Sequence, residues 1–136
     1  MGLLSTRSVS PGIRWCSEKN EKEVLVRSQD GCQYIKFAFP LYVTSAEEWN
    51  ENNEENRHGY VLVMFYTCIG EYEEKKHAVH VMNYLLAKRN YYMYDSQPDI
   101  KSVILNVPSD ELVRQTADEN LLDGIPVKDE EKTDVN

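Results

Sequence analysis

The side chains best suited to chemistry in this 136-residue sequence are its three cysteines and three histidines. They are Cys16, Cys32, Cys68, His58, His77 and His80. No two of them have the spacing that is typical of a zinc site. We therefore expect no bound metal and no cofactor. An odd number of cysteines also argues against a disulfide framework.

The segment most suggestive of catalysis is 77–97, with the sequence HAVHVMNYLLAKRNYYMYDSQ. We expect its two halves, 77–86 and 91–97, to form a β-hairpin around a polar four-residue turn. A histidine opens the first expected strand, and the second, aromatic strand ends in Asp95 and a serine.

This arrangement resembles the His-strand, hairpin and Tyr-Tyr-x-Asp-Ser block of the Ulp1-type family of SUMO- and ubiquitin-like-specific cysteine peptidases. It resembles papain-like peptidases more loosely. The resemblance covers residues 60–97 and implies His77 as the general base and Asp95 as the carboxylate that orients its ring. Ala78 stands where the family has a tryptophan, and the family's downstream Asp-Cys-Gly motif is missing, because no cysteine follows Cys68.

Two assignments within this hypothesis stay open. If Leu86 pairs with Tyr91, His80 and Asp95 become diagonal neighbours on one face, roughly 7–8 Å apart, so that strand pairing favours His80 as the base. The nucleophile is equally open. The candidate that we retain is Cys32, which follows an Asp-Gly turn at the start of an expected strand.

The same hairpin is rich in tyrosine and methionine, and these side chains suit an adhesive surface for a protein or peptide. The candidate contact residues are Tyr84, Tyr92, Met93 and Tyr94. Because the thiol chemistry is incomplete, we expect a non-catalytic protein-binding module that is built on a peptidase-like sheet. The alternative is a cysteine peptidase that cleaves peptide or isopeptide bonds.

The composition excludes some partners. The chain has 15 Lys and Arg against 23 Asp and Glu, a formal net charge of −8. Nucleic-acid binding requires a basic surface, so we expect no nucleic acid. No apolar run approaches the ~18 residues of a membrane-spanning helix.

The first residues fit two kinds of targeting signal. Gly2 and Thr6 fit the M-G-x-x-x-[ST] pattern of N-myristoylation, and one myristoyl chain would give weak, reversible membrane association. The same stretch is rich in serine and arginine and free of acids, which is also typical of a mitochondrial presequence. We expect a cytoplasmic protein, in peripheral contact with a membrane if Gly2 is acylated.

Alternating apolar residues and turn signals indicate the elements that would position these groups. Strands are expected at 23–28, 32–39, 60–69 and 101–107, beside the two of the hairpin. A capping box at Ser45 opens a polar helix to about Asn56, whose Asn/Glu stretch we interpret as a solvated face, and Ser109 opens a second helix to about Leu122.

These elements predict an α+β fold: a mainly antiparallel sheet of about six strands, with two helices packed on one face or end. We expect a flexible segment over 1–16, a single domain over 17–125 and an acidic disordered tail over 126–136.

Overall fold

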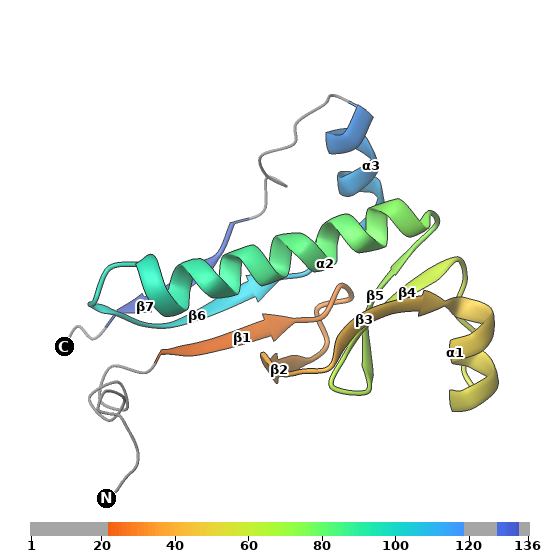
Figure 1. Ribbon diagram of the computed structural model, residues 1–136, viewed down its shortest axis with the longest axis horizontal. Coiled ribbons are helices and arrows are strands. Elements are labelled where there is room, and N and C mark those ends of the chain that lie inside the picture. The colour runs from red at the N-terminus through yellow and green to blue at the C-terminus, as the bar shows by residue number, and fades with distance from the viewer. Residues whose placement is uncertain (1–21, 119–127, 134–136) are drawn as a thin grey trace, which may run out of the picture.

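The computed structural model describes residues 22–118 and 128–133 (Figure 1). They form three α-helices and seven strands in two mostly antiparallel sheets, so the predicted α+β class is confirmed. The elements differ from the predicted ones mainly in residues 41–45, 60–97 and 128–133. In chain order they are β1 (Glu23–Arg27), β2 (Tyr34–Lys36), β3 (Leu41–Ser45), α1 (Ala46–Asn53), β4 (Tyr60–Met64), β5 (Thr67–Tyr72), α2 (Lys75–Asn90), the π-helical turn η2 (Tyr91–Asp95), β6 (Ile100–Asn106), α3 (Asp110–Asp118) and β7 (Glu130–Thr133).

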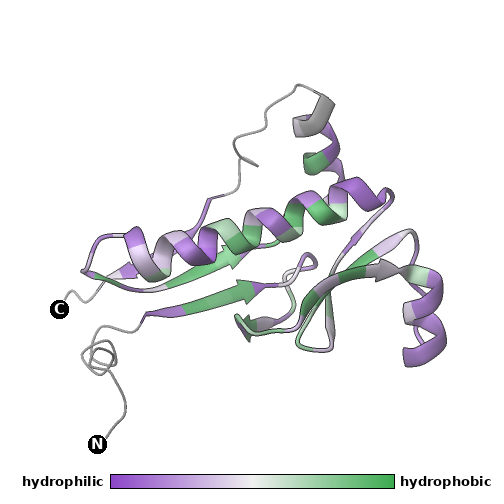
Figure 2. Cartoon of the chain, viewed as in Figure 1, coloured by the Kyte–Doolittle hydropathy of each residue, from purple (hydrophilic) through white to green (hydrophobic). Residues whose placement is uncertain are grey.

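The first sheet has the strand order β2-β1-β6-β7. β1 and β6 run parallel, while β2 and β7 are antiparallel to their neighbours. β1 and β6 are apolar along most of their length (Figure 2), as expected for parallel strands inside a fold. β1 and β2, which lie within the predicted strands 23–28 and 32–39, pair as an antiparallel hairpin. Gly31 occupies its loop with a φ of 76°, a conformation that glycine adopts without strain.

The second sheet contains β3, β4 and β5 and is antiparallel throughout. The single strand predicted over 60–69 is wrong, because the chain reverses at Phe65 and Tyr66 and returns as β5. β4 is the central strand, and its residues 61–64 are all buried. Burial on both faces explains why this run is apolar without alternation.

Residues 75–95 are helical, so the hairpin predicted over 77–97 is wrong. Buried side chains recur along this segment at helical rather than alternating spacing. They are His77, Ala78, Val81, Leu85 and Tyr92. The valines and tyrosines favour a strand by propensity, but burial of this stripe against both sheets outweighs that preference.

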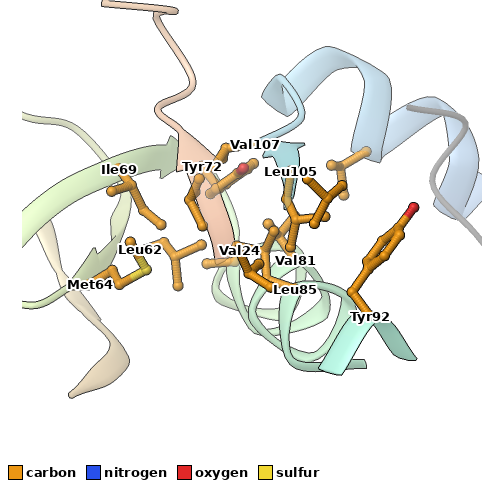
Figure 3. Close-up of a cluster of buried hydrophobic side chains, with 14 of the residues drawn as sticks. Val24, Leu62, Met64, Ile69, Tyr72, Val81, Leu85, Tyr92, Leu105 and Val107 are labelled. Carbon is orange, nitrogen blue, oxygen red and sulfur yellow. The ribbon is translucent and has the colours of Figure 1, made fainter. Parts of the chain in front are cut away.

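One apolar core joins α2 to both sheets (Figure 3). Val81 and Leu85 of α2 lie close to Val24 of β1, and Leu105 of β6 approaches the same cluster. The second sheet contributes further buried side chains, which are Leu62, Met64, Ile69 and Tyr72. A smaller cluster on the opposite face of β4 contains Ala46, Trp49, Val61 and Val63. The second sheet is therefore covered by α2 on one face and by α1 on the other.

Gln29 connects the two sheets through hydrogen bonds. Its backbone N–H donates to Ile69 O at 2.8 Å. Its side-chain amide accepts from the Glu71 N–H at 3.0 Å and donates to Glu71 O and Pro108 O, each at 3.1 Å. The Gln29 side chain thus gives the Glu71 N–H and C=O groups, at the outer edge of β5, the hydrogen-bond partners that a neighbouring strand would supply.

α1 begins where the capping signal predicts. The Ser45 hydroxyl accepts a hydrogen bond from the Glu48 N–H at 3.1 Å. The helix ends before the predicted Asn56, because Glu54 turns to a φ of 54° and donates its N–H back to Asn50 O. α1 is largely hydrophilic (Figure 2). Trp49 is its one large aromatic residue and is buried.

The C-terminal prediction needs one correction. Residues 130–133 form β7 along β6, so the disorder expected over 126–136 is wrong for them. Arg27 of β1 reaches across β6 to form an ion pair with Glu130 at 2.8 Å, which favours this pairing. α3 begins as predicted, with the Ser109 hydroxyl accepting from the Leu112 N–H. The expected flexible segment 1–16 and residues 134–136 lie outside the described residues.

Candidate functional site

The structure separates the residues of the predicted catalytic pair. His77 lies in the first turn of α2, and Asp95 ends η2 at the far end of the same helix (Figure 1). At ~1.5 Å per residue, the two positions are roughly 25 Å apart, and His80 is only about one turn nearer. A general base and the carboxylate that orients it must be in hydrogen-bond contact. Neither histidine can therefore work with Asp95 within this chain.

His77 is a core residue. Its side chain is 5% exposed, and its Nδ1 has no hydrogen-bond partner in the described part of the chain. His80 is half-buried and Asp95 is exposed. These positions indicate that the two histidines help to pack α2, whereas Asp95 lies at a solvated helix end.

The cysteines offer no activated thiol in the described residues, and Cys16 lies outside them. Cys32 is exposed in the loop between β1 and β2, where its N–H donates to Asp30 Oδ1 at 2.9 Å. Cys68 is half-buried on β5, and its thiol donates to Gly70 O at 3.5 Å. Burial raises the pKa of the Cys68 thiol, and nearby Arg57 only partly opposes this effect.

We expect Cys68 to react more slowly with a disulfide reagent than Cys32. Raised pKa and partial burial both reduce the accessible thiolate, so the labelling rates at pH 7.5 should differ by about tenfold or more. The measurement compares two double variants, Cys16→Ser/Cys32→Ser and Cys16→Ser/Cys68→Ser. A Cys68 that labels faster than Cys32, and is slowed by His77→Ala, would contradict this assignment.

The tyrosine and methionine residues proposed as a binding surface do not share one face. Tyr92 is 2% exposed and belongs to the core, with its hydroxyl 2.9 Å from Asp129 Oδ2 and 2.7 Å from Glu131 Oε2. Tyr84 and Met93 are half-buried, and only Tyr94 is well exposed. The prediction of Tyr92 as a partner contact is therefore wrong, because its ring anchors η2 beneath β7.

The exposed aromatic residues that are conformationally unusual lie elsewhere, in the turn between β4 and β5. Phe65 and Tyr66 have φ values of 49° and 65°, so both adopt the left-handed conformation. Their side chains are 53% and 69% exposed, and their rings touch with centroids 5.5 Å apart. Two-residue hairpin turns of this geometry normally contain asparagine and glycine. We call these two residues the aromatic turn.

A pocket of about 180 Å³ lies beside the aromatic turn. Tyr42 and Thr44 project into it from one face of β3, as the alternation of a strand requires. Consecutive turns of α1 supply further residues, and the turn supplies the last one. The full lining is Tyr42, Thr44, Glu48, Trp49, Asn52, Asn53 and Tyr66.

The pocket has acidic and aromatic character. Its lining contains no lysine, arginine or histidine, and Glu48 forms no ion pair with any residue of the described ranges. The Trp49 indole is held in place, because its Nε1 donates to Glu55 Oε1 at 3.1 Å. The pKa of Glu55 is lowered, mainly by its hydrogen bond from Arg57 and then by that from Trp49. The pocket can therefore attract cations and must repel anions.

Sequence reasoning missed this site. Phe and Tyr favour strands, so residues 65 and 66 carry no turn signal, and the sequence predicts that they lie in the middle of a strand. The polarity of the Asn/Glu stretch of α1 predicts a solvated face, whereas the structure places Asn52 and Asn53 in the pocket lining. The one available signal was Trp49, a large aromatic residue on a helix that has no other.

Comparison with known proteins adds no further assignment. No protein-family model, curated protein or solved structure matches the sequence. Within the described ranges, no group of three or more His, Cys, Asp or Glu side chains is arranged to hold a metal ion. None of the helices in those ranges combines the length and apolarity needed to cross a membrane. Gly2, the candidate for acylation, lies outside them.

Proposed function

We propose that this protein is a non-catalytic binding module that recognises a protein or peptide partner through its aromatic turn. The observation that carries the proposal is the strain at Phe65 and Tyr66. Left-handed backbone costs a non-glycine residue on the order of 1–3 kcal/mol. Because both side chains are more than half exposed, their burial offsets little of this cost.

Strain of this kind is characteristic of functional sites, where a side chain must be presented in a fixed direction. Exposed aromatic residues are also the side chains that contribute most to protein interfaces. A rigid two-residue turn holds the rings of Phe65 and Tyr66 outward, and this reduces the conformational entropy lost on binding.

The free edge of β3 is an argument for a partner segment in extended conformation. Ala46 donates to Gly59 O and Phe65 donates to Pro40 O, so the even-numbered residues of β3 are those bonded to β4. The backbone groups of Leu41, Val43 and Ser45 point to the other side. No described residue forms a backbone hydrogen bond with them there. Such an edge can pair with a peptide strand.

The peptidase alternative has no comparable observation behind it. The described cysteines and histidines form no hydrogen bond with one another, and the only aspartate that the hypothesis offered lies at the opposite end of α2. We therefore carry forward the binding function alone.

Selection of peptides from a random displayed library tests the proposal. The full chain is the bait, and Phe65→Asn/Tyr66→Gly, which keeps the turn geometry without the rings, is used for counterselection. We expect enriched peptides whose synthetic forms bind the natural chain saturably in calorimetry and bind the double variant at least about tenfold more weakly, as loss of hot-spot aromatics implies. Tyr94→Asn, which removes an equally exposed ring from η2, is the control and should leave the affinity unchanged.

Two outcomes would overturn the proposal. One is enrichment of peptides that bind the natural chain and the double variant equally. The other is binding that depends on Tyr94 and not on Phe65 or Tyr66.

A further inference from the structure

We infer that the pocket formed by α1, β3 and the aromatic turn binds a methylated ammonium group, presented as a methylated lysine side chain of the partner peptide. This inference rests on the proposed function, because it names the chemistry of one residue in that partner. It is carried by the residue types that converge on the pocket from three separate elements.

Three aromatic side chains line the pocket. Tyr42 comes from β3, Trp49 from α1 and Tyr66 from the aromatic turn. The face of an aromatic ring is electron-rich and attracts a cation within ~6 Å of its centre. Rings that surround a pocket on several sides are how proteins recognise quaternary ammonium groups.

The charge of the lining selects for a cation. Among the described residues, Glu48 is the only charged one that lines the pocket, and no cation in those ranges pairs with it. The chain as a whole carries a net charge of −8, which adds long-range attraction for a basic peptide. An anionic ligand would face both of these charges without a compensating donor of positive charge.

The aromatic walls favour a methylated ammonium over an unmodified lysine. An unmodified ammonium has three N–H donors and is strongly hydrated, so it loses water when it enters an aromatic pocket. Methylation removes these donors and spreads the charge over apolar surface, which the rings of Tyr42, Trp49 and Tyr66 can cover. The size also agrees, since a cavity of about 150 Å³ holds a benzene molecule and this pocket measures about 180 Å³.

The free edge of β3 explains how a peptide would deliver that side chain. Tyr42 and Thr44 share the face of β3 that lines the pocket, while Leu41 and Val43 offer the free backbone groups. A peptide strand paired with this edge places every second side chain on the same face as Tyr42 and Thr44. The Asn52 amide forms no hydrogen bond with a described residue and lies in the lining, where it can meet peptide backbone.

Nuclear magnetic resonance titration of the full ¹⁵N-labelled chain tests the inference. The probes are N-acetyl-trimethyllysine methylamide, the unmodified lysine analogue and a neutral isostere with a tert-butyl group in place of trimethylammonium. We expect the trimethyllysine probe to shift the Trp49 indole N–H and to bind at least about fivefold more tightly than either other probe, in line with cation–π energies.

Variants distinguish the effect of the Glu48 charge in the pocket from the effect of the general acidity of the chain. Glu48→Gln and Tyr66→Leu should each weaken binding of the trimethyllysine probe by about fivefold or more. Glu47→Gln is the matched control, because Glu47 is the neighbouring residue of α1 but does not line the pocket. It should leave the affinity within about twofold, as expected for a screened surface charge.

Several results would overturn the inference. Equal binding of the neutral isostere would show that the positive charge is not recognised. Equal effects of Glu47→Gln and Glu48→Gln would show that the probe does not bind in the pocket. If library peptides bind through Phe65 and Tyr66 while the trimethyllysine probe does not bind, the inference fails and the proposed function stands. Sedimentation with phosphatidylcholine vesicles, lost in Tyr66→Leu, would assign the pocket to a lipid headgroup instead of a peptide.

Discussion

Replacement of Gln29 by alanine is expected to lower the free energy of unfolding by about 2–3 kcal/mol, in spite of the partial exposure of this side chain. The substitution removes three side-chain hydrogen bonds that join β5 and the segment after β6. It leaves the N–H and C=O groups of Glu71 without a protein partner at a partly buried sheet edge. Urea denaturation followed by far-UV circular dichroism gives the change.

Two variants bracket this result. Gln33→Ala changes an exposed glutamine of the same loop whose side chain forms no hydrogen bond with the described residues, so its effect should stay within about 0.5 kcal/mol. Gln29→Glu keeps an acceptor for the Glu71 N–H but directs a carboxylate at two carbonyl oxygens, and should destabilise at least as much as alanine. If Gln29→Ala and Gln33→Ala are equally mild, Gln29 does not connect the sheets.

Substitution of the aromatic turn should have the opposite sign. Phe65→Asn/Tyr66→Gly introduces the two residues that this turn geometry prefers, and should raise the free energy of unfolding by about 2 kcal/mol. For a domain of this size the melting temperature should rise by roughly 10 °C. Calorimetric melting of both proteins under the same conditions provides the comparison.

Strain relief can be distinguished from the removal of exposed aromatic surface. Tyr94→Asn also removes an exposed ring, but from η2, where the backbone is right-handed. It should produce no comparable gain. A double variant at residues 65 and 66 that is less stable than the natural chain would mean that the rings support the fold, and the argument from strain would fail. A variant that is more stable but no longer binds the partner would show the trade-off between stability and function that is seen at many sites.

Local signals in the sequence were sufficient for several elements. The hydroxyls of Ser45 and Ser109 cap their helices, as predicted for the capping box at Ser45 and for the helix start at Ser109. The apolar run beginning at Tyr60 correctly predicted that a strand begins there, although that strand ends at Met64. Such signals depend only on residues close in sequence, so they can be recognised without knowledge of the tertiary fold.

The long helix could not be read from propensity. Residues 77–97 contain valines and tyrosines that favour strands, and their burial depends on contacts with β1, β4 and β6, which are distant in sequence. The helical spacing of Ala78, Val81 and Leu85 was present, but Met82 and Leu86 add apolar residues beside this stripe, so it is not the only apolar pattern in the segment. Tertiary packing decided between the two patterns.

The candidate site was still less accessible to sequence reasoning. The aromatic turn violates local turn chemistry, so any prediction from residue preferences places Phe65 and Tyr66 in a strand. The pocket needs Tyr42, Trp49 and Tyr66 to converge from three elements, and their separation in sequence gives no hint of that. Conflict between local preference and observed structure is what marks a site of this kind.

The most direct test of the account is isotope-filtered nuclear Overhauser spectroscopy of the labelled chain bound to an unlabelled peptide from the library selection. Among the described residues, exposed aromatic rings lie at the aromatic turn and also elsewhere, at Tyr34, Phe39, Tyr42, Tyr91 and Tyr94. We expect Overhauser contacts from peptide protons to the rings of Phe65 and Tyr66. Contacts confined to Tyr34, Phe39, Tyr91 or Tyr94, with none at the aromatic turn, would contradict the account.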